Sequence, residues 1–313
     1  MTPAPARTGM SIEFRGLSKS FGGVQAVSDL TFEVAPGRVT GFLGPNGSGK
    51  TTTLRMLMGL VTPDAGTALV GGRPYAEHPH PARVVGASLE ASFHPGRTAR
   101  GHLRTLAPHV GVPAARVDEV LAQVGLSAAA DRKVGGFSLG MRQRLALATT
   151  LLGDPDVLVL DEPANGLDPA GIIWLRDLLR FLASEGRTVL VSSHVLAEVQ
   201  ATVDDVVVIA QGRLVHASSL AEMVRLADSH VRVCGPDLAA LATVAQEQGW
   251  RVDRRGDHLR ISGASAAQVG AAAFAAGQAV HELTEVGANL EETFLQLVSG
   301  ESVAAEKTQE VAA

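Results

Sequence analysis

The feature that most constrains this chain is an octapeptide at positions 44–51, which reads Gly44-Pro45-Asn46-Gly47-Ser48-Gly49-Lys50-Thr51. Its glycines permit backbone angles that other residues avoid, so consecutive N–H groups can turn inward around a polyphosphate. Lys50 can bring a positive charge to the β- and γ-phosphates, and the Thr51 hydroxyl can bind Mg²⁺. The pattern predicts a phosphate-binding loop, and the alternative is a flexible glycine-rich turn.

The residues on either side of this loop favour the phosphate-binding interpretation. Val39–Leu43 is a short apolar run typical of a buried strand, and Thr52–Leu57 has the composition of a helix start. A strand, a glycine-rich loop and a helix N-terminus in this order form an anion site, because free N–H groups meet the positive end of the helix dipole there.

Composition limits the class of protein. With 313 residues, of which 46% are hydrophobic and 19% charged, the chain has room for about two folded domains. A net charge of -5 and a pI near 6.1 argue against a protein that coats nucleic acid. Cys234 is the only cysteine, which excludes an internal disulfide and a zinc site of several cysteines. We expect no signal peptide at residues 1–10 and no membrane span, because no apolar run approaches about 20 residues.

Residues 11–225 have the pattern of an α/β domain. Buried strands and one long helix are expected at Val157–Leu160, Thr188–Val191, Val206–Ile209 and Ile172–Ala183. Buried strands that alternate with helices predict a mainly parallel sheet. Within this domain, residues 78–98 are rich in Pro, His and Gly, and we expect an exposed excursion there. His78 and His80 are expected to be solvated loop residues, because no further metal ligands stand at suitable spacing.

Residues 226–300 differ in character and predict a second, small α+β domain. Strand and helix patterns alternate in the order β-α-β-β-α-β, at His230–Cys234, Asp237–Gln248, Trp250–Asp253, His258–Ser262, Ala264–Ala276 and Val280–Val286. That order is the split βαβ pattern of a two-layer domain. Asn289 is expected to cap a last helix at Leu290–Val298. Residues 1–10 and 301–313 are expected to be disordered.

Two carboxylates follow the apolar run Val157–Leu160, at Asp161 and Glu162. They are expected at the C-terminal end of a strand, which is where ligands bind in open α/β sheets. Beside a phosphate loop, one acid can hold Mg²⁺ and the other can accept a proton from an attacking water. The alternative is an ordinary strand end with two acidic residues.

Three further segments accompany the phosphate loop and the acid pair, in the order Phe137-Ser138-Leu139-Gly140-Met141-Arg142-Gln143-Arg144, Gly166-Leu167-Asp168-Pro169 and Ser192-Ser193-His194. With them, residues 12–215 resemble the ATP-binding subunit of an ATP-binding-cassette (ABC) transporter. The first segment resembles the family signature LSGGQ-x-QR, with departures at Phe137, Leu139 and Met141. Its Ser-Leu-Gly-Met form is similar to that of bacitracin- and lantibiotic-type exporter ATPases. Each short motif is weak alone, whereas five in the family's order are highly specific.

The resemblance implies a role for each segment, with ATP and Mg²⁺ as cofactors. Residues 44–52, Thr52 included, would bind the nucleotide, Thr51 and Asp161 the metal, and Glu162 would activate water. His194 would contact the γ-phosphate within the subunit, and Asp168 belongs to the loop at the dimer interface. Ser138, Leu139, Gly140 and Met141 would contact the ATP of a second subunit, because the signature faces the γ-phosphate across a dimer.

The roles expected of one aromatic residue and one acidic residue depend on the same resemblance. Phe21 stands where the family places the aromatic that stacks on adenine, and its alternative is a core residue. Glu90 stands where the family has a glutamine that senses the metal and contacts the membrane partner. A carboxylate keeps an oxygen that can face the metal but adds negative charge and loses the amide donor. Our hypothesis is that Glu90 couples the nucleotide state to the permease and possesses a metal-facing oxygen.

The function that these motifs predict is ATP hydrolysis that powers an exporter of drugs, peptides or other small molecules. The resemblance implies a separate transmembrane permease, a homodimer or heterodimer of ATPase subunits, and a peripheral position on the cytoplasmic side of the membrane. The alternative is a soluble ABC ATPase that acts on ribosomes or nucleic acid. Such proteins usually have two cassettes or a long coiled coil, and this sequence shows one cassette and no heptads. The substrate and the direction of transport are not encoded here, since a permease would select them.

Overall fold

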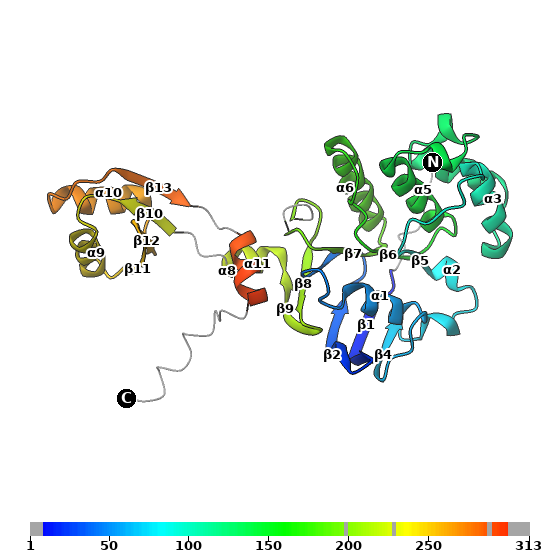
Figure 1. Cartoon of the computed structure of the whole chain (residues 1–313), viewed down its shortest axis with the longest axis horizontal. Helices are drawn as coiled ribbons and strands as arrows, with labels where there is room; N and C mark the ends of the chain where they lie inside the picture. The colour runs from blue at the N-terminus through cyan, green and yellow to red at the C-terminus, as the bar shows by residue number, and fades with distance from the viewer. Residues whose placement is uncertain (1–8, 197–199, 227–229, 287–289, 300–313) are drawn as a thin grey trace. The chain divides into compact units, whose positions relative to one another are not determined.

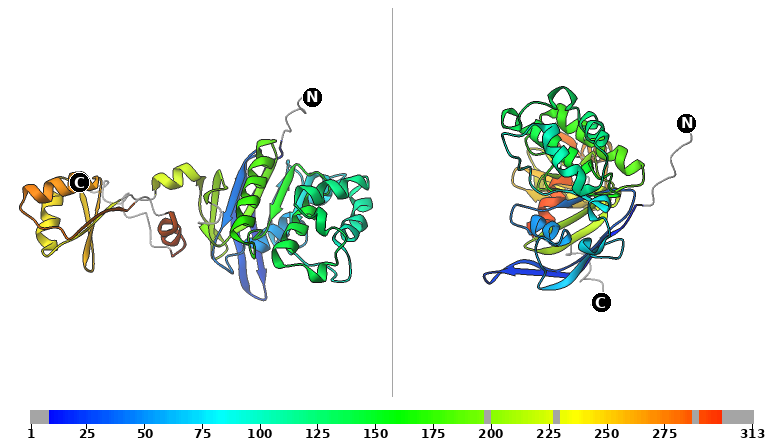
Figure 2. Two further views of the ribbon diagram at one scale, coloured as in Figure 1. Left: turned by 90° about the horizontal axis from the view of Figure 1, so that it is seen from above. Right: turned by 90° about the vertical axis from the view of Figure 1, so that its right-hand side faces the viewer.

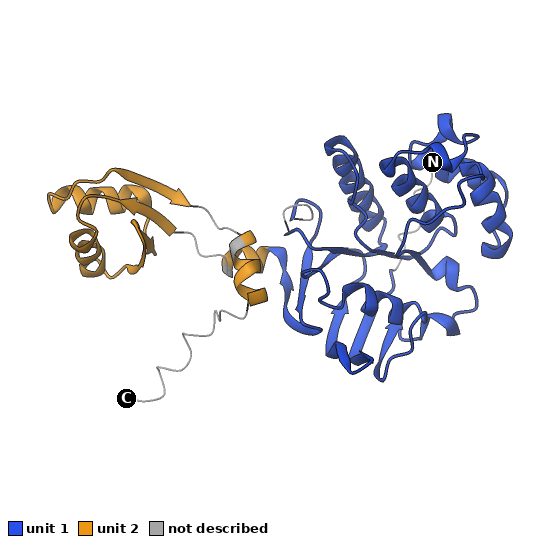
Figure 3. Ribbon diagram, viewed as in Figure 1, with its two compact units in different colours: residues 1–220 blue, residues 221–313 orange. Residues whose placement is uncertain are grey.

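A computed structural model describes residues 9–196, 200–226, 230–286 and 290–299. The chain divides into two compact units, residues 1–220 and 221–313 (Figure 3). Disorder is predicted for residues 1–10 and 301–313; of these, residues 1–8 and 301–313 lie outside the described residues, as does the helix cap predicted at Asn289. Residues 9 and 10 are described, and the carbonyl oxygen of Met10 accepts a hydrogen bond of 2.7 Å from Thr188 Oγ1.

A six-stranded sheet forms the centre of the first unit. Its strands, in spatial order, are β5 Val85–Ser88, β6 Val157–Leu160, β7 Thr188–Ser193, β3 Val39–Leu43, β8 Asp205–Ala210 and β9 Arg213–Ser219. All neighbours are parallel except β8 and β9, which are antiparallel. The mainly parallel sheet predicted from the apolar runs is therefore confirmed. Strand β3 is buried along its whole length because it lies between β7 and β8.

A second, antiparallel sheet in the same unit is absent from the sequence-based prediction. It has the order β2-β1-β4, formed by β1 Ile12–Phe21, β2 Val24–Val34 and β4 Ala65–Val70. Phe14 stacks on Phe32 with ring centroids 4.4 Å apart, and Phe32 stacks on Phe42 of β3 at 5.4 Å. These rings bury apolar surface between the two sheets, which is the main stabilising contribution of such a core.

The helices of the first unit cover the two faces of the six-stranded sheet. They are α1 Lys50–Leu57, α2 Pro81–Val84, α3 Ala99–Val110, α4 Ala115–Gln123, α5 Leu139–Leu151 and α6 Pro169–Ser184, with short 3₁₀ turns at Tyr75–Glu77, Ser127–Ala129 and Val134–Gly136. Helices α5 and α6 lie on one face, whereas α1 and the antiparallel sheet lie on the other (Figure 1; further views in Figure 2). Thr98 and Asp168 cap the N-termini of α3 and α6 with their side chains.

The exposed excursion predicted for residues 78–98 is wrong in two respects. Val85–Ser88 forms β5, whose apolar residues pair with β6 at the edge of the central sheet. His78 is only 9% exposed, and its Nε2 lies 3.0 Å from the carbonyl oxygen of Val70. The prediction that His78 is solvated is therefore wrong, because a single backbone partner satisfies the ring in a buried position. His80 is exposed, as expected.

The second unit has the predicted βαββαβ order. Its elements are α8 Leu220–Leu226, β10 His230–Cys234, α9 Leu238–Glu247, β11 Arg251–Arg255, β12 His258–Ser262, α10 Ala266–Ala275, β13 Glu282–Val286 and α11 Leu290–Ser299. The four strands form an antiparallel sheet in the order β11-β12-β10-β13. Strand residues Val231, Val233, Leu259 and Ile261 pack against α9 and α10 in a separate core. Among the described residues, no helix has the length and apolar character that a bilayer span requires.

Candidate functional site

The loop at residues 44–51 connects β3 to α1, as the sequence predicts. Gly47 and Gly49 have φ angles of 80° and 102°, a region that side chains with a Cβ rarely adopt. A Cβ on Gly49 would lie 2.5 Å from the carbonyl oxygen of Ala26, so the backbone there has no room for a larger residue. The Ser48 hydroxyl is buried and has no hydrogen-bond partner. An orphaned polar atom in a glycine-lined loop fits a site that binds phosphate oxygens.

Lys50 lies at the first turn of α1 and is only 6% exposed. Its Nζ donates hydrogen bonds to the carbonyl oxygens of Gly44 at 2.6 Å and Pro45 at 3.2 Å. It also lies 3.7 Å from Glu162 Oε1. Burial lowers the pKa of the Lys50 ammonium, and the charges of Glu162 and Asp161 oppose that shift. The cation is therefore held inside the loop that would enclose phosphates.

The two predicted acids follow β6, and Asp161 faces the phosphate loop. Thr51 Oγ1 donates a hydrogen bond of 2.6 Å to Asp161 Oδ2. A hydroxyl and a carboxylate are the ligands that Mg²⁺ takes from proteins when phosphates and water complete its octahedron. The described residues contain no cluster of three or more His, Cys, Asp or Glu that could hold a metal by themselves. Thr51 and Asp161 thus fit a metal that is bound together with a nucleotide.

Both carboxylate oxygens of Glu162 have a partner. Its Oε2 lies 2.9 Å from His194 Nδ1, and its Oε1 lies near Lys50 as described. Its backbone has a φ of 48°, the left-handed region that costs a residue other than glycine roughly 1–3 kcal/mol. Strain of this kind is concentrated at functional sites, where the surrounding structure maintains it.

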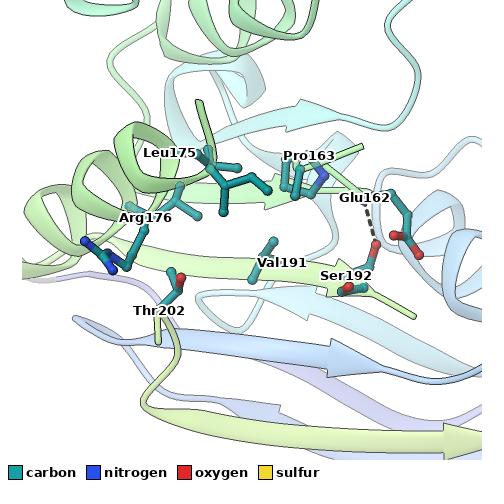
Figure 4. Close-up of a pocket in the computed structure, with 11 residues that line it drawn as sticks. Glu162, Pro163, Leu175, Arg176, Val191, Ser192 and Thr202 are labelled. Carbon is teal, nitrogen blue, oxygen red and sulfur yellow. Dashed lines mark hydrogen bonds between the residues drawn. The ribbon is translucent and has the colours of Figure 1, made fainter. Parts of the chain in front are cut away.

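Two residues that contact Glu162 were not singled out in the sequence. Ser192 Oγ accepts a hydrogen bond of 2.9 Å from the Glu162 N–H, and Gln143 Nε2 donates one of 3.3 Å to the Glu162 carbonyl oxygen. Figure 4 shows the Ser192 contact beside a small apolar cavity of about 20 Å³ lined by Pro163, Leu175 and Val191. Both residues lie within motifs quoted above, but nothing in the spacing of those motifs shows which side chain reaches a backbone group.

The signature segment begins α5. Ser138 caps this helix, since its Oγ accepts a hydrogen bond of 3.3 Å from the Met141 N–H. Leu139 is 58% exposed, and Gly140 follows it in the first turn. A Cβ on Gly166 would lie 2.1 Å from Leu139 Cδ2, so the loop that precedes α6 packs tightly against the signature. Among the described residues, no hydrogen bond or ion pair joins Ser138, Leu139, Gly140 or Met141 to residues 44–52.

The other predicted site residues lie apart from this cluster. Phe21 ends β1 and is 50% exposed, with Lys19 Nζ 5.4 Å from its ring centroid, which excludes the alternative of a core residue. Asp168 Oδ1 accepts a hydrogen bond of 2.8 Å from Gly171 N–H and caps α6. Glu90 is exposed and follows β5. The structure therefore brings together Lys50, Thr51, Asp161, Glu162 and His194. In the described part of the chain, no hydrogen bond or ion pair joins Phe21, Asp168 or Glu90 to this cluster.

A mainly parallel sheet, a glycine-rich loop between β3 and α1, and an acid pair at the end of β6, two strands away from β3, define a P-loop nucleotide-binding protein. Comparison with known proteins identifies the family within this class. A family model described as ABC transporter matches residues 27–165, and one described as a domain of unknown function (DUF8746) matches residues 229–291. The chain belongs to the family of ABC transporter ATP-binding proteins, whose ATP-binding domain hydrolyses ATP in a reaction coupled to transport.

Individual relatives cover much of the chain. It is 39% identical over 260 residues to the Nod factor export ATP-binding protein I of Ralstonia nicotianae, and the aligned region covers 80% of each chain. It is 42% identical over 207 residues to the bacitracin transport ATP-binding protein BcrA of Bacillus licheniformis, spanning 65% of this chain and 68% of that protein. A solved structure of an ATP binding subunit of an ABC transporter superposes with a TM-score of 0.62 at 27% identity, over 68% of this chain and 92% of that one.

The loop geometry generates a prediction about Gly49. We expect Gly49→Ala to weaken ATP binding by roughly tenfold or more, because the new Cβ is strained by the backbone angle and meets the Ala26 carbonyl. Equilibrium titration with a fluorescent ATP analogue measures the change. Gly59→Ala is the matched control, since Gly59 also has a positive φ, at 70°, but nothing lies within 4 Å of its added Cβ. Equal affinities for the two variants would contradict the prediction.

Proposed function

We propose that this chain is the ATP-hydrolysing subunit of an exporter whose transmembrane segments lie on a separate permease. The observation that carries the proposal is the cluster in which Lys50, Thr51, Asp161, Glu162 and His194 converge at one edge of the sheet. A relative named for Nod factor export supports the direction of transport, and one named for bacitracin transport supports the assignment to a transporter. The chain would then act on the cytoplasmic side of the membrane, where ATP is available and a permease can bind it.

The chemistry of the cluster follows from the position of each group. Lys50 would bind the β- and γ-phosphates in place of the loop carbonyls that it now contacts. Thr51 and Asp161 would hold Mg²⁺, which when bound neutralises charge that develops on the phosphates. Glu162 would accept a proton from the attacking water, and His194 would keep the Glu162 carboxylate oriented and contact the γ-phosphate. Most of the rate enhancement would come from positioning and charge stabilisation.

A second ATPase subunit would complete the site. Ser138 and Gly140 begin α5, where unpaired N–H groups and the helix dipole favour an anion, yet they make no bond to their own phosphate loop. An ATP bound by a second subunit would provide that anion. A homodimer and a heterodimer with a related subunit both satisfy this arrangement. In either dimer, Asp168 would belong to the loop at the interface between the subunits, and Phe21 would stack on the adenine.

Purification from membranes tests the transporter assignment. We expect the tagged full-length chain, expressed in its native host and extracted in detergent, to co-purify with a polytopic membrane protein in a stoichiometric amount. Mass spectrometry of the purified complex identifies that protein, and an untagged strain provides the control. Recovery from the soluble fraction alone, together with ribosomal or DNA-bound proteins, would instead establish the soluble alternative.

The role of Glu162 can be tested by removing its charge alone. We expect Glu162→Gln to bind ATP with nearly unchanged affinity and to hydrolyse it at least about 100-fold more slowly, because an amide cannot accept the proton of water. Steady-state turnover and nucleotide titration measure the two quantities. Glu119→Gln serves as the control, since Glu119 pairs with Arg116 on the surface of α4. Turnover near that of the unaltered chain would remove Glu162 from the proposed role.

Glu90 is proposed to couple the nucleotide state to the permease. We expect Glu90→Ala to change the ATPase rate or the transport rate of the complete transporter several-fold, because it removes an oxygen that can face the metal. Transport into vesicles and ATP turnover are measured on the same preparation. Glu77→Ala, at another exposed acid of the first unit, is the control. Unchanged rates of both ATP hydrolysis and transport would refute the role of Glu90.

A further inference from the structure

The conformation of Glu162 depends on hydrogen bonds that its own side chain does not make. Its φ of 48° is unfavourable for a residue with a Cβ, so neighbouring groups have to hold the backbone there. The carbonyl oxygen of Glu162 accepts bonds from two donors, Gln143 Nε2 at 3.3 Å and Asn165 N–H at 3.2 Å. In the described part of the chain, its N–H donates a hydrogen bond to Ser192 Oγ at 2.9 Å.

The directions of the bonds at Ser192 are determined by its partners. A backbone N–H can only donate, so the Ser192 oxygen accepts from Glu162. A serine hydroxyl has one proton, with which it donates a hydrogen bond of 2.5 Å to Asp161 Oδ1. One hydroxyl therefore contacts both acids of the pair, the carboxylate of the first and the backbone of the second. Ser192 is fully buried, so water does not compete for these bonds.

The position of Ser192 also relates Glu162 to His194. Strands β6 and β7 are parallel neighbours, with Leu160 in register with Val191, and the two acids follow β6 just as Ser192 follows Val191. His194 follows two residues later, and its Nδ1 lies 2.9 Å from Glu162 Oε2. The Ser192 bond thus ties the end of one strand to the next at the point where the carboxylate and the imidazole meet.

We propose that Ser192 is a positioning residue for ATP hydrolysis, which holds Glu162 in its left-handed conformation by accepting the Glu162 N–H while donating to Asp161. The inference rests on the proposed role of Glu162 as the group that accepts a proton from water. Without the hydroxyl, a buried N–H is left without an acceptor and the backbone can relax from its strained angle. The carboxylate would then leave the place where it can reach an attacking water, whereas the phosphate contacts of Lys50 would be kept.

The experiment compares kcat, KM and ATP affinity in full-length variants, purified with any membrane protein that accompanies the chain. We expect Ser192→Ala to lower kcat about tenfold or more, with KM and affinity changed less than about twofold. Ser192→Thr keeps the hydroxyl, and the adjacent cavity of about 20 Å³ can receive the extra methyl group, so we expect it to restore most of kcat. Unaltered kcat in Ser192→Ala, or an equal loss in Ser192→Thr, would overturn the proposal.

Thr40→Val is the matched control for loss of a buried hydroxyl. Thr40 is 1% exposed on β3, pairs with Leu190 of β7, and its hydroxyl makes no hydrogen bond. We expect this variant to retain kcat, and a loss equal to that of Ser192→Ala would mean that any such change in the sheet disturbs turnover. Should Ser192→Ala fail to fold, Ser192→Cys, which is similar in size with a weakly hydrogen-bonding thiol, should show the same selective loss of kcat.

A double variant separates this inference from the proposed role of Glu162. If Ser192 acts through Glu162, adding Ser192→Ala to Glu162→Gln should lower the residual turnover by less than about twofold. An additional tenfold loss would show that Ser192 acts elsewhere and would overturn the proposal. Normal turnover in Glu162→Gln alone would refute the role of Glu162. Slow turnover in Glu162→Gln together with normal turnover in Ser192→Ala would leave that role intact and refute the positioning role only.

Discussion

The hydrogen bond from Thr51 to Asp161 is the interaction on which the site depends. It joins residues that are 110 positions apart in the chain, one at the start of α1 and the other after β6. Asp161 also accepts a hydrogen bond from the Ser192 hydroxyl of β7, so a single carboxylate links three segments at the same edge of the sheet. A parallel sheet makes this possible because the carboxyl ends of its strands meet at one edge.

Charge balance around Lys50 explains how a cation can be buried at that edge. Removing an ammonium group from water is costly, and burial lowers the pKa of Lys50 for that reason. The charges of Glu162 and Asp161 oppose the shift, and two loop carbonyls accept hydrogen bonds from Nζ. The buried cation therefore has anionic and polar partners before any nucleotide enters. Phosphate oxygens offer the same kind of partner with more negative charge, which suits the loop to its ligand.

The division into two units separates nucleotide chemistry from the rest of the chain. All residues of the cluster lie in residues 1–220, and the ABC transporter family model matches within that unit. The second unit has its own core between an antiparallel sheet and two helices, and it matches a domain of unknown function. The buried apolar residues of this core all come from the second unit, as is typical of a separate domain.

The sequence alone determined the local features whose causes are local. The spacing of Gly47, Gly49, Lys50 and Thr51 predicts the loop, since backbone freedom and side-chain charge belong to those residues themselves. Apolar runs likewise predict the strands of the parallel sheet, and their alternation with helices predicts the βαββαβ order of the second unit. Sequence patterns did not reveal the antiparallel sheet, because its strands are half-buried and depend on the stacking of Phe14, Phe32 and Phe42 from distant segments.

Only the tertiary structure decided which side chains serve the acid pair. Ser192 and Ser193 are indistinguishable in the sequence, yet one bonds to Asp161 and Glu162 while the other bonds to Val195. Strand register and the left-handed angle of Glu162 select between them, and neither is encoded in a short motif. His78 was also misjudged from the sequence, because the fold of the chain around it buries its ring against the carbonyl oxygen of Val70, eight residues earlier. Residue identity thus supplied the chemistry, and the pairing of distant strands determined where that chemistry is placed.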